Sequence, residues 1–190
     1  ETVVVLENVG TYFYRGLVRD GVASTLLSPP DFADIRAQTK SLSDVGGAMT
    51  CSGIVRAAGP PRPVARVLVT ERLMPLLSPR VRFGRALNAG DFAPGATPAA
   101  VVTESMWRRY FGSDPHATGR AVQLDSQPFA LVGVVPDSTL AFLRQPSGIF
   151  EQAPAEWFIS PLVAEMSGSQ APTVRSSAEQ RDGPALCVVA

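Results

Sequence analysis

The chain has 190 residues, 45% of them hydrophobic, which is enough for one good core or two small lobes. Lys plus Arg and Asp plus Glu both number 17, so the formal net charge is +0, and no run of like charge indicates a surface for nucleic acid or anionic lipid. The longest apolar stretches, such as 99–103 and 130–135, are far shorter than the roughly 20 residues that cross a bilayer, so no membrane span is expected.

The first elements are strand-like. Thr2–Leu6 is β-branched and apolar, which predicts a buried strand, and Asn8–Gly10 predicts the turn that ends it. Residues 11–27 have an irregular pattern in which Gly16 and Gly21 follow charged residues, so we expect a loop or a ragged hairpin there.

A helix is expected directly afterwards. Ser28 can cap it, and the two prolines that follow suit its first turn, where backbone N–H groups need no helical partner. Phe32, Ile35 and Leu42 fall close to one face, which predicts that this helix packs on a sheet.

A hairpin and two short helical segments come next. Residues 48–58 and 63–69 read as strands joined at Gly59-Pro-Pro, because prolines cannot continue a sheet ladder. Thr70 is predicted to cap a short helix that carries three apolar residues, Leu73, Met74 and Leu77, and ends before Pro79.

The next unit is a strand followed by a helix. Residues 99–102 predict the strand, and Thr103 is expected to cap the helix. Gly112 is placed to end it in the left-handed conformation. The apolar stripe of this helix is made of Met106, Trp107, Tyr110 and Phe111, and we expect it to be core.

The C-terminal half adds more strands. Residues 119–124 and 128–135 predict a second hairpin, 157–161 another strand, and 164–182 a polar surface loop or frayed helix. Residues 186–189 close the chain as a strand. We expect the two terminal strands to share one sheet, with the middle of the chain as an inserted lobe.

No residue pattern predicts catalysis. His116 is the one histidine, and it lies in a turn without any nucleophile or metal motif, so a solvated turn residue is expected. Asp31 and Asp34 are one helical turn apart, but acids in the first turn of a helix are explained by its dipole. Arg108 and Arg109 could bind an anion, although the exposed side of a helix explains them better.

Cys51 and Cys187 are far apart and belong to no C-x-x-C pair. We favour two buried small hydrophobic residues, and a disulfide is the alternative in an oxidising compartment. We expect no catalytic, cofactor-binding or metal-binding residues, and no cofactor. Because the chain starts at Glu1 and ends within a strand-like run, we also expect a piece of a longer protein.

Several blocks carry a family resemblance. Three of them strongly resemble the periplasmic core domain of MacB-like ABC transporter permeases; they are residues 107–115 (WRRYFGSDP), 119–125 (GRAVQLD) and 129–136 (FALVGVVP). Three others resemble the same domain in the duplicated permease branch of that family; they are residues 27–38 (LSPPDFADIRAQ), 83–92 (FGRALNAGDF) and 156–162 (EWFISPL).

The resemblance implies an α+β, mixed-sheet domain of two lobes between two transmembrane helices. A split Porter-like lobe would comprise 1–70 plus 163–190, and an inserted Sabre-like lobe 71–162. The implied role is non-catalytic: the periplasmic domain of a bacterial inner-membrane permease relays ATP-driven motion for efflux or for export of lipoproteins or other substrates.

The implied partners are the transmembrane helices of the same protein, a cytoplasmic ATPase subunit acting through them, a periplasmic adaptor and a second permease copy. No nucleic acid partner is expected. Two alternatives remain open, a secreted module that binds a protein or ligand and, less favoured, a small hydrolase.

Overall fold

The computed structural model describes residues 5–6, 8–14, 17–24, 26–27, 29–40, 44–57, 60–144, 156–162 and 186–189. The first part of the chain holds β1 (Val5–Leu6), β2 (Asn8–Tyr14), β3 (Leu17–Ser24), β4 (Leu26–Leu27), α1 (Pro29–Gln38), β5 (Gly46–Arg56) and β6 (Arg62–Val69). The middle holds α2 (Leu73–Leu77), β7 (Phe83–Gly84), η1 (Ala89–Phe92), β8 (Ala99–Thr103), α3 (Glu104–Phe111) and η2 (Pro115–Ala117). The last part holds β9 (Ala121–Leu124), β10 (Gln127–Val135), η3 (Asp137–Arg144), β11 (Trp157–Pro161) and β12 (Leu186–Val189). The fold is mixed α+β, as expected.

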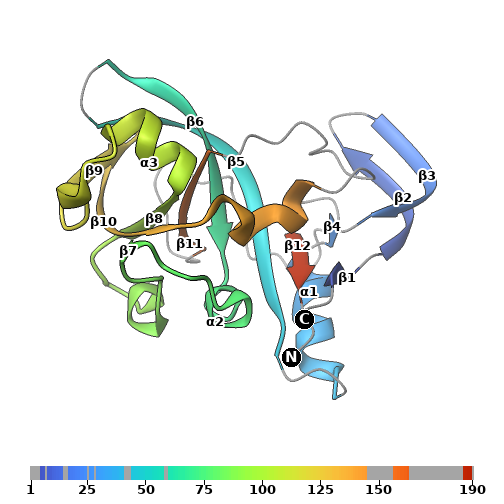
Figure 1. Ribbon diagram of the computed structural model, residues 1–190. Helices are drawn as coiled ribbons and strands as arrows, with labels where there is room; N and C mark the ends of the chain where they lie inside the picture. The colour runs from blue at the N-terminus through green and yellow to red at the C-terminus, as the bar shows by residue number, and fades with distance from the viewer. Residues whose placement is uncertain are drawn as a thin grey trace.

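Ten strands form one mixed sheet, in the order β1-β12-β5-β6-β11-β8-β10-β7, with β4 on β12 and β9 between β10 and β5. Part of this sheet closes into a ring. Each strand of the ring pairs with the next in the order β5-β6-β11-β8-β10-β9, and β9 pairs with β5. The ring is a small barrel, seen at the end of the molecule that carries α3, while β2 and β3 form a separate hairpin at the other end (Figure 1).

The inside of the barrel is a packed apolar core. All six barrel strands contribute, and α3 adds two residues to it; the buried members are Val55, Val64, Ala100, Val102, Met106, Trp107, Ala117, Val122, Leu124, Phe129, Leu131, Val134 and Phe158. The rings of Phe129 and Phe158 meet edge to face with centroids 5.4 Å apart. The side chains of the described strands therefore fill the interior of the barrel.

A second core lies on the outer face of the sheet, where α2 and η3 cover β6, β8 and β11. Each core holds one of the two tryptophans. Trp107 belongs to the inner core and donates from its indole nitrogen to the carbonyl oxygen of Asp114 at 2.9 Å. Trp157 belongs to the outer core, and its buried indole nitrogen has no hydrogen-bond partner among the described residues.

A third and smaller core joins α1 to the sheet. Phe32 and Ile35 of α1 pack against Val45, Met49 and Leu68. The helix begins at Pro29 and presents its apolar face to β5 and β6, as the sequence pattern predicted. Leu42, which was expected on the same face, and the cap residue Ser28 lie outside the described residues. Within the described chain, no helix has both the length and the apolar character to cross a bilayer.

Most strand and hairpin predictions are confirmed. β5 and β6 pair antiparallel, β9 and β10 form the second hairpin, and β1 pairs with β12, so the terminal strands share a sheet. Gly112 ends α3 with a φ of 60°. The predicted polar segment 164–182 lies outside the described residues.

Three local predictions are wrong. Asn8–Gly10 is not a turn, because β2 begins at Asn8 and pairs antiparallel with β3, with an irregularity in the register between Gly10 and Tyr12. Thr70 does not cap α2, since its hydroxyl accepts from the backbone N–H of Gly47 at 2.8 Å. Thr103 does occupy the N-cap position of α3, but the predicted side-chain cap is wrong, because its hydroxyl accepts from the backbone N–H of Trp157 at 2.9 Å and makes no cap bond.

Candidate functional site

The polar residues singled out from the sequence do not converge on one site. His116 is exposed in η2, which follows α3 at the barrel end, whereas Asp34 is exposed on α1 beside the terminal strands (Figure 1). The side chain of Asp31 lies outside the described residues. No group of three His, Cys, Asp or Glu residues could hold a metal ion in the part of the chain that the structure describes. The exposure of His116 agrees with the expected solvated position, which lies in the short 3-10 helix η2.

Arg108 and Arg109 lie on the exposed side of α3, as expected. Arg108 pairs with Glu104 at 2.9 Å, one turn earlier on the same helix, and Arg109 pairs with Glu156 at 3.0 Å, just before β11. These pairs tie the outer side of α3 to its own first turn and to the barrel.

The two cysteines lie on adjacent strands but at different register positions. Cys187 of β12 lies opposite Ala48 of β5, three residues before Cys51. Three residues of strand span about 10 Å, which is beyond the roughly 7 Å between Cα atoms that a disulfide tolerates. Cys51 is free, half-buried and packed against the core that α1 covers, which favours the interpretation as a small hydrophobic residue.

A polar cluster that the sequence interpretation missed lies at one end of the barrel. Arg66 of β6 is only 5% exposed, and its Nε donates to the hydroxyl of Ser160 on β11 at 3.0 Å. Its guanidinium also lies 5.3 Å from the centre of the Phe129 ring. Cys51 is directly opposite Arg66 on β5. Together these side chains separate the barrel core from the core under α1.

The electrostatics of this cluster do not favour nucleophilic chemistry. Burial raises the pKa of the Cys51 thiol, although the charge of Arg66 acts to lower it. Burial likewise lowers the pKa of Arg66, while Cys51 and Asp125 act to raise it. A protonated thiol is a poor nucleophile, and Asp125 is engaged in accepting from the backbone N–H of Ile54 at 2.8 Å. The arrangement is that of a structural polar junction.

One sequence signal could have revealed it. Val64, Arg66 and Leu68 occupy alternate positions of β6 and therefore share a face, and the first and last are buried. An arginine between two buried apolar positions of a strand indicates a charge held in the interior.

The raised pKa of Cys51 leads to a testable expectation. In a chain whose Cys187 is replaced by Ser, we expect a thiol reagent at mildly alkaline pH to modify native Cys51 roughly tenfold more slowly than the unfolded chain, because burial disfavours the thiolate. Absorbance of the released reagent measures both rates. Equal rates in the native and unfolded chains would contradict the burial of this thiol.

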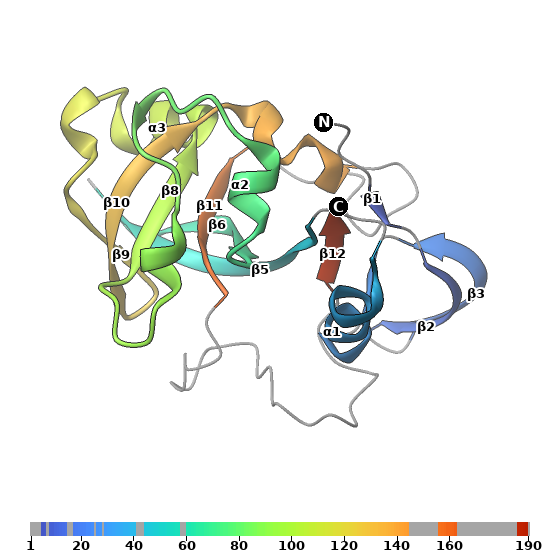
Figure 2. The ribbon, with the colours of Figure 1, turned by 90° about the horizontal axis from the view of Figure 1, so that it is seen from below.

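The terminal strands form the other feature relevant to function. Val5 of β1 pairs with Val189 of β12, and Leu6 pairs with Val188, so both ends of the described chain enter the sheet at one place. From there β12 pairs with β5 at Gly46–Ala48, and the far end of β5 pairs with β9 at Val55–Arg56. One strand thus connects the terminal strands to the barrel, as two views at right angles show (Figures 1 and 2).

The comparison with known families agrees with this architecture. The sequence profile described as "MacB-like periplasmic core domain" matches residues 3–181. The chain belongs to this family. The resemblance of the sequence to a MacB-like periplasmic core domain of an ABC transporter permease is therefore confirmed. No curated protein sequence is similar enough to the chain to count as a match.

Solved structures share the MacB-like fold at low sequence identity. The periplasmic region of MacB from Actinobacillus actinomycetemcomitans is 16% identical with a TM-score of 0.56, over 84% of this chain and 61% of that region. The extracellular domain of the noncanonic ABC-type transporter YknZ from Gram-positive bacteria is 15% identical with a TM-score of 0.57, over 87% of this chain and 73% of that domain.

A domain of a putative permease protein from Porphyromonas gingivalis is 10% identical with a TM-score of 0.58, over 98% of this chain and 71% of that domain. At these identities the likeness concerns the fold alone. The chain spans less than two thirds of the length of the MacB region it resembles.

Proposed function

We propose that the chain is the extracytoplasmic domain of an ABC-type permease, on the periplasmic side of a bacterial inner membrane, and that it transmits ATP-driven conformational change without catalysing a reaction. Efflux or export of lipoproteins or other substrates is the transport that this domain would serve. Membership of the MacB-like periplasmic core domain family supports the setting.

The pairing of β1 with β12 is the observation that carries the mechanical part of the proposal. Because the terminal strands are hydrogen-bonded to each other and then to β5, a displacement applied at the chain ends enters a continuous ladder. That ladder continues through β5 into the closed barrel. Packed strands move as rigid bodies, so motion at one edge would reorient the barrel rather than deform it locally.

The division into lobes is part of the same proposal. The Porter-like lobe would comprise 1–70 plus 163–190, and the Sabre-like lobe 71–162. The sheet would then cross from one lobe to the other at two places, the parallel pairing of β6 with β11 and the antiparallel pairing of β5 with β9. The proposed partners are membrane helices on both sides of the domain, an ATPase subunit that drives them, a periplasmic adaptor and a second permease copy.

Flexible insertions test the mechanical role. In the full-length permease with its ATPase, we expect glycine-serine linkers inserted just before β1 and just after β12 to reduce transport at least about tenfold while ATP hydrolysis continues, because a flexible coil cannot transmit displacement. Transport assays and phosphate release measure the two activities separately. Undiminished transport would reject force transmission through the chain ends.

The control is the same linker inserted after Gly95, which lies in an exposed loop with nothing within 4 Å of where its Cβ would be. This variant is expected to transport normally. Equal loss in the control and the test variant would mean that the insertion damages the domain itself, and would remove the support for a relay.

A further inference from the structure

The outer side of α3 carries a concentration of arginine in a chain whose formal net charge is +0. Arg108 and Arg109 belong to α3, Arg82 pairs with Glu104 of the same helix at 3.6 Å, and Arg62 lies over the Tyr110 ring at 5.8 Å. We call Arg62, Arg82, Arg108 and Arg109 the arginine surface.

The carboxylates of this region do not balance the arginines. Glu104 is shared by Arg82 and Arg108, and Glu156 pairs with Arg109. Among the described residues, Arg62 takes part in no ion pair. Within the described part of the chain, the four guanidinium groups outnumber their partners Glu104 and Glu156 by two, and a third carboxylate, Asp137, is engaged with Ser105 at the start of α3.

The geometry also places the positive groups outermost. Arg108 and Arg109 have 58% and 63% of their side-chain surface exposed, whereas their partners Glu104 and Glu156 have 19% and 23%. A molecule that approaches α3 therefore meets guanidinium groups before it meets carboxylates. Arg109 uses only one of its nitrogens, Nη1, for Glu156, so other N–H donors of its fork remain for an incoming acceptor.

These side chains are held in place before any partner binds. The Tyr110 ring lies 5.8 Å from both the Arg62 and the Arg109 guanidinium carbons, and its hydroxyl donates to the carbonyl oxygen of Pro63 at 3.2 Å. Arg108 is fixed by its partner one turn away. Restraint of long side chains lowers the entropy lost on binding, which is a property of recognition surfaces.

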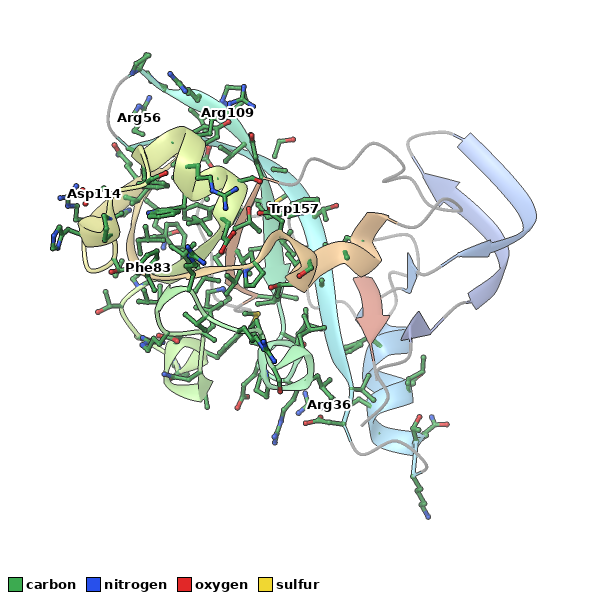
Figure 3. The ribbon with its side chains drawn as sticks, viewed as in Figure 1. Arg36, Arg56, Phe83, Arg109, Asp114 and Trp157 are labelled. Carbon is green, nitrogen blue, oxygen red and sulfur yellow. The ribbon has the colours of Figure 1, made fainter. Side chains whose placement is uncertain are left out.

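We propose that the arginine surface docks an acidic segment of a protein partner. Guanidinium groups bind carboxylates with paired N–H donors, and the excess of exposed arginine over carboxylate favours an acidic chain over a neutral one. An anionic membrane is the other surface with complementary charge. Arg109 lies at the barrel end of the molecule, whereas Arg36 belongs to α1, which lies beside the terminal strands and away from α3 (Figure 3).

The choice of protein over lipid rests on the proposed function. If the chain ends continue into membrane helices, the end that carries α3 is the one remote from those helices. The arginine surface would then face away from the bilayer and toward soluble or adaptor proteins.

Binding of an oligoglutamate peptide tests the docking surface. We expect the chain to bind a fluorescein-labelled oligoglutamate at low salt, measured by fluorescence anisotropy, and added salt to weaken the binding. The double variant Arg62→Gln plus Arg109→Gln is expected to bind about five- to tenfold more weakly. The matched control, Arg36→Gln plus Arg72→Gln, removes the same charge from exposed arginines elsewhere and should bind as the parent does.

Three outcomes would overturn the docking proposal. They are absence of peptide binding, an equal loss in the test and control variants, and preferential binding to phosphatidylglycerol vesicles over the peptide. Because this assay needs neither ATPase nor membrane helices, its result is independent of the linker test of force transmission. A negative result in the peptide-binding assay therefore does not contradict force transmission, and a negative result in the linker test does not contradict peptide binding.

Discussion

Replacing Gly133 of β10 with Ala is expected to lower the free energy of unfolding by about 3 kcal/mol. A Cβ at this position would lie 2.0 Å from the carbonyl oxygen of Arg85, which follows β7. The obstacle is backbone, not a flexible side chain, and Arg85 is held there because its N–H donates to the carbonyl oxygen of Val132 at 2.9 Å. The short β7 strand must therefore move away from β10. Denaturant unfolding followed by circular dichroism measures the change.

Two other glycines separate steric contact from backbone conformation. Gly95 has a φ of 74° with open space around it, so Gly95→Ala should cost only about 1 kcal/mol, from strain alone. Gly84 combines a φ of 70° with a contact of 2.1 Å to the carbonyl oxygen of Val132, so its substitution should be at least as damaging as that of Gly133. A Gly133→Ala variant no less stable than Gly95→Ala would show that β7 does not approach β10 so closely.

Replacing Phe158 with Ala is expected to cost about 4 kcal/mol, because it removes a fully buried ring from the centre of the barrel and leaves a cavity. The ring also loses its edge-to-face contact with Phe129. For a domain of this size the midpoint of thermal unfolding should fall by roughly 10 °C. Differential scanning calorimetry measures the shift.

Ile54 supplies the matched control for the large-to-small substitution. It is 46% exposed on β5, so Ile54→Ala should change stability by no more than about 1 kcal/mol. A loss in Phe158→Ala as small as in Ile54→Ala would show that the barrel interior is not the packed core described above.

Local structure was predictable where one short segment contains all the interactions that determine it. The stop of α3 at Gly112 depends on neighbouring residues, and the turn between β9 and β10 follows a local turn pattern, although Asp125 in it also bonds to Ile54 of β5; both were expected. The caps failed for the opposite reason. The hydroxyls of Thr70 and Thr103 accept from Gly47 and Trp157, which are 23 and 54 residues away, so no local pattern could assign them.

The closure of the barrel and the burial of Arg66 were equally non-local. The ring closes through pairing of Val55 on β5 with Leu124 on β9, two strands that are far apart in the sequence. Arg66 is buried because Ser160 and Phe129 come to it from strands that follow much later. The family resemblance supplied the overall architecture, and the candidate surface on α3 depends on exposures that only the folded chain has.

The division of the two tryptophans between the inner and outer cores gives the protein a pair of built-in optical probes. Since Trp107 and Trp157 are the only indoles in the chain, Trp107→Phe leaves emission from the α2 side of the sheet, and Trp157→Phe leaves emission from within the barrel. Stopped-flow fluorescence of the two variants can then measure the unfolding rate of each core without any attached dye.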